Sequence, residues 1–109
     1  MVKKTNLGPL KYAWDAWTEV EASILKLPAD HFQTTLLTQI LEVREALALD
    51  NKSHAAEEVC DIISVALNWL RSLGLTEADI AKVLQSRSEK RYVGQAAAIM
   101  RKYQKRYGI

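Results

Sequence analysis

Near its middle the chain contains the segment LEVREALALDNKSHAAEEVCDIISVAL, which spans residues 41–67. It holds two acidic pairs, Glu42 with Glu45 and Glu58 with Asp61. The members of each pair are three residues apart, so on an α-helix both carboxylates lie on one face, about 4.5 Å apart along the axis. The segment therefore predicts two helices that each carry a double-acid face.

A short polar turn, Asp50-Asn51-Lys52, separates the two pairs and predicts a hairpin of antiparallel helices. With the centre of the turn between its last two residues, Glu45 and Glu58 are equally far from it. The same holds for Glu42 and Asp61. This register predicts that Glu45 lies level with Glu58 and that the four carboxylates converge within one helical turn.

Apolar residues at three- and four-residue intervals predict further helices around this hairpin. The first helix is expected over residues 10–27. Ser53 is predicted to cap the helix after the turn, and Gly74 to end it. Another helix is expected to begin at Thr76, and a last, basic helix to cover residues 95–107. The predicted fold class is all-α, a four-helix-type bundle with a basic C-terminal helical tail.

The length and composition favour one globular domain. The chain has 109 residues, of which 49% are hydrophobic and 26% charged. A single Cys excludes a disulfide framework and a Cys-based zinc site. No apolar run approaches the 18 residues of a membrane span, and no apolar segment follows the basic N-terminus. We expect one domain over residues 1–109, with its core at about 10–94 and its tail at 95–109, in the cytoplasm and without a membrane partner.

Four carboxylates this close together repel one another, and such repulsion raises the pKa of a carboxyl group. A hard divalent cation relieves it, and Mg²⁺ in particular is held by carboxylates and water while it binds substrate phosphates. Mg²⁺ is therefore the predicted cofactor, with Mn²⁺ as its substitute. Zn²⁺ is disfavoured, because no Cys or His is placed among the four acids.

The alternative interpretation is that each acidic pair is an ordinary solvated helix face. Two features favour a cleft instead. The pairs are mirror-related about the turn, and most of their neighbours on the helical wheel are apolar. On the helix that follows the turn, the ordinary solvent-exposed polar edge consists only of Glu57, Ser64 and Arg71. A charge lodged between apolar flanks requires a partner.

An ExxE pair followed after 12 residues by ExxD, on consecutive helices, resembles the MazG-like family of all-α nucleoside triphosphate pyrophosphohydrolases. The similarity continues through Leu73-Gly74-Leu75 to Lys90-Arg91-Tyr92 and covers residues from about 30 to 94. The resemblance implies a helical bundle that forms dimers or tetramers. It also implies cleavage of a (d)NTP into a (d)NMP and pyrophosphate. The metal-binding and catalytic residues that it implies are Glu42, Glu45, Glu58 and Asp61.

The substrate would be held by side chains outside the acidic pairs. Cations near the end of the fourth helix would stabilise the pyrophosphate leaving group. Candidates for contacting the nucleoside are an amide beyond Asp61 on the same helix face and two tryptophans of the first helix. The tryptophans equally fit core or dimer packing. The expected substrate-binding residues are Arg87, Lys90, Arg91, Asn68, Trp14 and Trp17.

Two other functions compete with this hypothesis. Residues 85–109 have a net charge of +6 and the rest of the chain −4, so the basic end could bind nucleic acid. Residues 75–84 are similar to the first helix of a helix-turn-helix, but Glu89, Lys90 and Arg91 occupy apolar positions of the second, which disfavours nucleic acid as partner. The third hypothesis is a regulatory helical dimer without catalysis.

Overall fold

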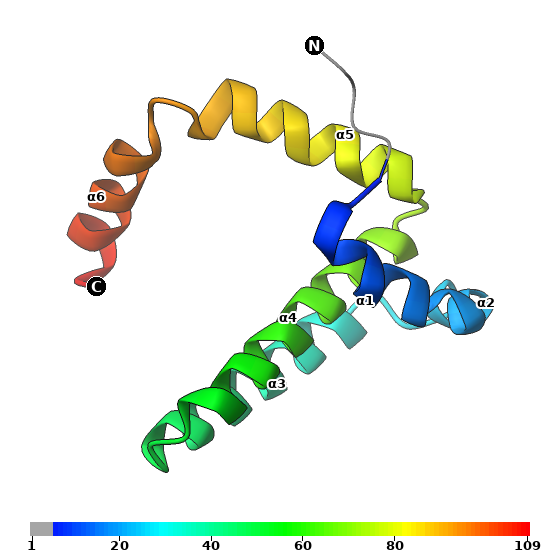
Figure 1. Cartoon of the computed structure of the whole chain (residues 1–109), viewed down its shortest axis with the longest axis horizontal. Coiled ribbons are helices and arrows are strands. Elements are labelled where there is room, and N and C mark those ends of the chain that lie inside the picture. The colour runs from blue at the N-terminus through cyan, green and yellow to red at the C-terminus, as the bar shows by residue number, and fades with distance from the viewer. Residues whose placement is uncertain (1–5) are drawn as a thin grey trace. The chain divides into compact units, whose positions relative to one another are not determined.

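The computed structural model describes residues 6–109, which form helices joined by short turns (Figure 1). No strand occurs in these residues, so the all-α prediction is confirmed. The contacts divide them into two compact units, one of residues 8–76 and one of residues 77–109 together with Asn6 and Leu7. The predicted core over residues 10–94 spans parts of both units.

The first unit is built on an antiparallel hairpin of two long helices, α3 (His31–Ala48) and α4 (Lys52–Ser72). They lie side by side in Figure 1. Their facing sides bury apolar residues, as amphipathic helices do when they pack. The buried residues of the pair that carry apolar side chains are Phe32, Ala46, Ala55 and Leu67.

The turn between α3 and α4 is centred on Asp50, whose φ of 53° puts it in the left-handed region. That conformation ends a helix. The side chain of Asn51 then accepts a hydrogen bond from the His54 N–H at 3.1 Å and caps α4. The predicted cap, Ser53, is instead the second residue of the helix. The centre of the turn therefore lies about one and a half residues earlier than the sequence predicted.

The N-terminal part of this unit is not the single helix expected over residues 10–27. It is a series of short helical pieces: η1 (Gly8–Leu10), α1 (Lys11–Ala16), η2 (Thr18–Val20) and α2 (Glu21–Ile24). Of these, α1 and α2 pack against α4. The break follows Trp14, whose carbonyl oxygen accepts hydrogen bonds from Arg71 Nη2 at 2.7 Å and from the Thr18 hydroxyl at 3.1 Å. These bonds occupy the carbonyl that the next helical turn would use.

Arg71 on α4 ties these pieces to the hairpin. It is only 1% exposed, and its guanidinium lies 3.6 Å from the centre of the Trp14 ring. Nη2 also donates to Thr18 Oγ1 at 3.0 Å, and Nη1 donates to Asn68 Oδ1 at 3.2 Å. The prediction that Arg71 belongs to a solvent-exposed polar edge is therefore wrong. Acceptors from a segment more than 50 residues earlier enclose this cation.

The second unit contains α5 (Glu77–Arg87), the π-helical turn η3 (Ser88–Tyr92) and α6 (Ala96–Tyr107). The Glu77 carboxylate accepts a hydrogen bond from the Leu7 N–H at 3.1 Å. Gly94 has a φ of 77° and separates η3 from α6. The last basic helix is thus found where it was expected.

Replacing Arg71 by Leu removes the donors that bind the Trp14 carbonyl and the Asn68 amide oxygen, and leaves both acceptors without that partner. We expect the Arg71→Leu variant to lose about 2–4 kcal/mol of unfolding free energy, measured by urea denaturation. Arg101→Leu makes the same change at an exposed position of α6 and should stay within about 0.5 kcal/mol of the wild type. Equal losses in both variants would contradict the role given to Arg71.

Candidate functional site

Carboxylates of α3 and α4 meet across the hairpin. Glu42 and Glu58 are each eight residues from Asp50, the centre of the turn, and so lie level with each other. With its amide nitrogen facing them, Gln39 donates to Glu58 Oε2 at 3.0 Å and to Glu42 Oε2 at 3.2 Å. The side chain of Glu58 is only 13% exposed. Two acids from different helices therefore share one amide donor in a partly buried place.

The pKa of Glu58 is raised above its ordinary value. The largest cause is a hydrogen bond with the Glu42 carboxyl group, which requires that one of the two groups is protonated. Burial and the negative charges of Glu42 and Asp61 raise the pKa further. His54, whose Nε2 lies 3.4 Å from Glu58 Oε1, lowers it. The neighbouring carboxyl groups therefore make Glu58 a weaker acid than an ordinary Glu.

The fourth predicted acid lies outside this cluster. Glu45 is exposed on α3 and is not among the groups whose charge shifts the pKa of Glu58. The predicted pairing of Glu45 with Glu58 is replaced by that of Glu42 with Glu58, because the turn is centred on Asp50. In residues 6–109 no three His, Cys, Asp or Glu side chains have the geometry of a metal site. The four-carboxylate metal site stays a prediction.

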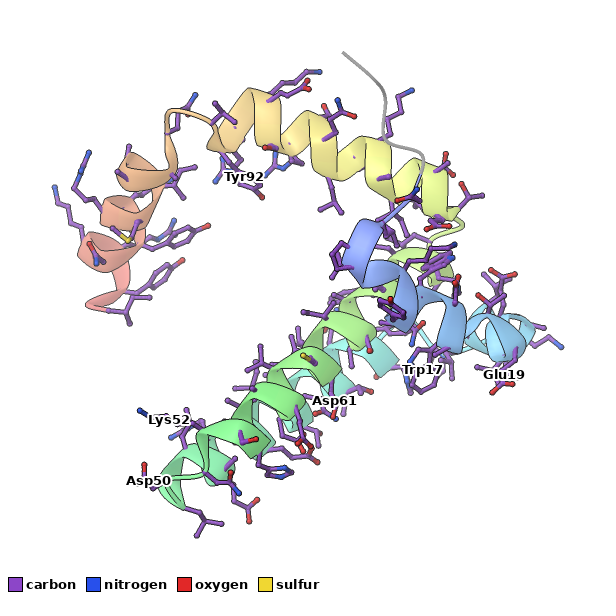
Figure 2. The ribbon with its side chains drawn as sticks, in the orientation of Figure 1. Trp17, Glu19, Asp50, Lys52, Asp61 and Tyr92 are labelled. Atoms are coloured by element: carbon purple, nitrogen blue, oxygen red, sulfur yellow. The ribbon has the colours of Figure 1, made fainter. Side chains whose placement is uncertain are left out.

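A pocket of about 350 Å³ lies next to the acids in the same compact unit. It is lined by residues of α3, α4, α2 and the segment around it. Figure 2 labels Asp61 on α4 and Trp17 at the junction of α1 and η2, and both belong to the lining. The lining residues are Trp17, Ile24, Leu27, His31, Phe32, Thr35, Gln39, Asp61, Ser64, Val65 and Asn68.

The pocket and the acidic cluster share two residues. Asp61 lines the pocket, and its charge raises the pKa of Glu58. Gln39 also lines the pocket and donates to Glu42 and Glu58. A molecule in the pocket therefore has aromatic and aliphatic walls and carboxylates close by.

Two of the predicted substrate-binding residues, Trp17 and Asn68, line the pocket. Trp14 is 7% exposed, and the Arg71 guanidinium covers its ring. Sequence reasoning missed Gln39 and Phe32, which lie one helical turn or more before Glu42 on the same helix. Gln39 lies three residues before Glu42, so the two side chains share one helix face, and this spacing was the signal available for Gln39.

The predicted phosphate-binding cations belong to the second unit. Arg87 is the last residue of α5 and is exposed, and its guanidinium lies 5.8 Å from the centre of the Tyr92 ring. Lys90 and Arg91 lie in η3. Their contact with a substrate stays a prediction.

No protein-family model, curated protein or solved structure matches this chain. Within residues 6–109 no single helix is long and apolar enough to cross a membrane, and one bent pair, α4 with α5 and η3, reaches that length and apolarity together.

The raised pKa of Glu58 makes the metal-free protein sensitive to pH. The folded protein binds this proton more tightly than the unfolded chain does, so its stability falls as the pH rises from the ordinary pKa of a Glu to the raised one. We expect Glu58→Gln to raise the melting temperature of the metal-free protein at about pH 7 by a few degrees, and the gain to shrink at about pH 4.

The matched control is Glu57→Gln, which makes the same change at a side chain that is 74% exposed and next in sequence. It should leave the melting temperature nearly unchanged at both pH values. A Glu58→Gln variant that melts below the wild type at neutral pH would show that the carboxylates do not repel one another there.

Proposed function

We propose that this protein is a divalent-metal-dependent nucleoside triphosphate pyrophosphohydrolase, which cleaves a (d)NTP into a (d)NMP and pyrophosphate. The observation that carries the proposal is that Asp61 belongs both to the pocket lining and to the group of acids that act on Glu58. An occupant of the pocket therefore lies beside a cluster of oxygen ligands. The sequence resemblance to the MazG-like family supports the same activity.

The pocket suits a flat aromatic group with polar edges. Trp17 and Phe32 supply aromatic surface, and Ile24, Leu27 and Val65 supply aliphatic surface. Ligand pockets of about 300–1,000 Å³ with apolar walls and few polar groups are typical of small-molecule sites. A nucleobase matches these walls, because its faces are apolar and its edge carries donors and acceptors. We therefore place the base in this pocket and the phosphates on the side of the acids.

The donor set fits a hard cation. Glu42, Glu58 and Asp61 offer carboxylate oxygens, the ligands that Mg²⁺ and Mn²⁺ prefer. These three residues would hold the ion, with Glu45 as the further ligand that the resemblance implies. The bound ion supplies charge neutralisation of the phosphates and a lowered pKa of bound water. Gln39 donates to the Glu42 and Glu58 carboxylates and holds both in position.

The resemblance to the MazG-like family also implies cations that act on the phosphates. A triphosphate brings several negative charges toward acids, so further positive charge is needed where the pyrophosphate leaves. Arg87, Lys90 and Arg91 are the residues that we propose for this role. Their three positive charges lie within five residues, at the end of α5 and in η3.

We further propose that the protein forms a homodimer, or a tetramer of two such dimers. Along α3, four apolar side chains are at least 41% exposed, and they recur at intervals of three, four and seven residues, which places them on one stripe. Two packed helices leave such a stripe in water, whereas a second hairpin covers it and forms a four-helix bundle. The stripe consists of Leu37, Ile40, Leu41 and Leu47.

One observation favours a second candidate function. Arg101, Lys102, Lys105 and Arg106 lie on α6, which contains no acidic residue. Such a helix binds phosphate backbones without sequence preference. Retention on DNA that falls with salt and survives Asp61→Asn would support this function in place of hydrolysis.

The enzymatic proposal predicts pyrophosphate release from a panel of triphosphates with Mg²⁺ or Mn²⁺, and none with a chelator. Asp61→Asn and Glu42→Gln should each lower kcat/KM at least about 100-fold, because metal ligation and charge are lost while size is kept. Glu57→Gln, an exposed change on the same helix, should retain wild-type activity. If both site variants release pyrophosphate as fast as the wild type, the proposed metal site is contradicted.

The dimer proposal predicts a mass in solution of at least twice the 12.3 kDa of one chain. Leu41→Glu places a charge on a side chain that is 60% exposed in one copy, so it should shift the mass toward the monomer. Val83→Glu, on α5 and 46% exposed, is the control and should leave the mass unchanged. Light scattering after size-exclusion chromatography measures both, and a wild-type mass near 12.3 kDa would overturn the proposal.

A further inference from the structure

One polar side chain in the pocket lining has a fixed hydrogen-bonding polarity. Asn68 is 8% exposed, and its amide oxygen accepts a hydrogen bond from Arg71 Nη1. A guanidinium only donates, so it holds the oxygen of this amide toward itself and the nitrogen away from itself. Arg71 is in turn held by the Trp14 carbonyl oxygen and by Thr18. The orientation of the Asn68 amide is therefore set by a network that the substrate does not touch.

The amide nitrogen of Asn68 has no hydrogen-bond acceptor among the described residues. In residues 6–109 the one buried side-chain nitrogen or oxygen that is both unpartnered and sealed from solvent is Arg71 Nε, which lies 3.5 Å from Glu21 Oε1. Asn68 Nδ2 is thus reachable, and the residue lines the pocket. A ligand that shields this N–H group from water without accepting its hydrogen bond costs free energy, so the group favours a ligand with an acceptor at that place.

We infer that Asn68 is a specificity-determining residue, whose amide N–H group donates to a ring carbonyl oxygen of the bound base. The inference rests on the proposed function, because it takes the occupant of the pocket to be a nucleobase. The substrates would then be nucleotides of hypoxanthine, guanine, uracil, thymine or cytosine, all of which carry a ring carbonyl. Adenine carries an amino group where hypoxanthine carries this carbonyl, so a base bound in the same orientation would place a second donor against the Asn68 donor.

Other polar groups of the lining do not impose this choice. The Ser64 hydroxyl rotates and serves as donor or acceptor. The Thr35 hydroxyl already donates to the His31 carbonyl oxygen at 2.7 Å. The Gln39 nitrogen donates to the acids. In Asn68, by contrast, the buried Arg71 guanidinium fixes the orientation of the amide, so its N–H group can only donate to a ligand.

Inosine and adenosine monophosphates test the inference, because they have the same charge and nearly the same size and differ at the carbonyl. We expect calorimetry to give at least about tenfold tighter binding of the inosine than of the adenosine compound, since a missing hydrogen bond at a buried polar group costs about that factor. Uridine monophosphate should also bind more tightly than the adenosine compound. Equal affinities, or no binding of any of the three, would overturn the inference.

Asn68→Asp is the informative variant, because it keeps the shape and its carboxylate still accepts from Arg71. Its second oxygen presents an acceptor to the pocket, so the preference should shift toward the adenosine compound by about tenfold. The ratio of the two affinities is the readout, since a purely structural change or the added negative charge lowers both affinities alike. An unchanged ratio in a folded variant would contradict the role of Asn68.

Binding and hydrolysis separate this inference from the proposed function. A preference for the inosine compound without any triphosphate hydrolysis would leave the inference standing and overturn the enzymatic proposal. Hydrolysis of inosine and adenosine triphosphates with equal kcat/KM would support the enzymatic proposal and overturn the inference about Asn68.

Discussion

A buried guanidinium organises the first compact unit. Arg71 is charged at all accessible pH values, and it can only donate hydrogen bonds, so burial is tolerable only where acceptors surround it. Burial lowers its pKa, which the charges of Glu21 and Asp15 partly offset. The Trp14 carbonyl and the Thr18 hydroxyl come from the N-terminal pieces, and the Asn68 amide comes from α4. These bonds hold α1 on α4, end α1 after one turn and a half, and fix an amide in the pocket.

The acids impose the opposite kind of constraint. The negative charges of Glu42 and Asp61 repel that of Glu58 and, with the Glu42 hydrogen bond and burial, raise its pKa. A cation bound between these groups, as proposed, would relieve that repulsion. Arg71, Glu58 and Asp61 lie on α4, with Arg71 towards its C-terminal end and the two acids nearer the turn, whereas Glu42 lies on α3. Asp61 of the acidic cluster and Asn68 of the Arg71 network both line the pocket.

The sequence predicts the helices and the hairpin well, because apolar spacing and the polar turn are local signals. It predicts the register of the acids less well. The register depends on Asp50, whose left-handed conformation moves the centre of the turn, and Gly is the residue that normally signals that conformation. The break after Trp14 and the burial of Arg71 depend on contacts between residues 57 positions apart, which no local pattern contains. Type and spacing single out Asp61, Trp17 and Asn68, which the structure brings to one pocket. The orientation of the Asn68 amide follows only from its buried neighbour Arg71.

The carboxylate centre is tested most directly by counting bound Mn²⁺ with electron paramagnetic resonance, in the absence of nucleotide. The signal of free Mn²⁺ should fall as wild-type protein is added and should stay unchanged with Asp61→Asn or Glu42→Gln. Glu57→Gln should behave as the wild type. Equal loss of the free signal in the wild type and both site variants, or no loss in any of them, would contradict a metal held by these acids.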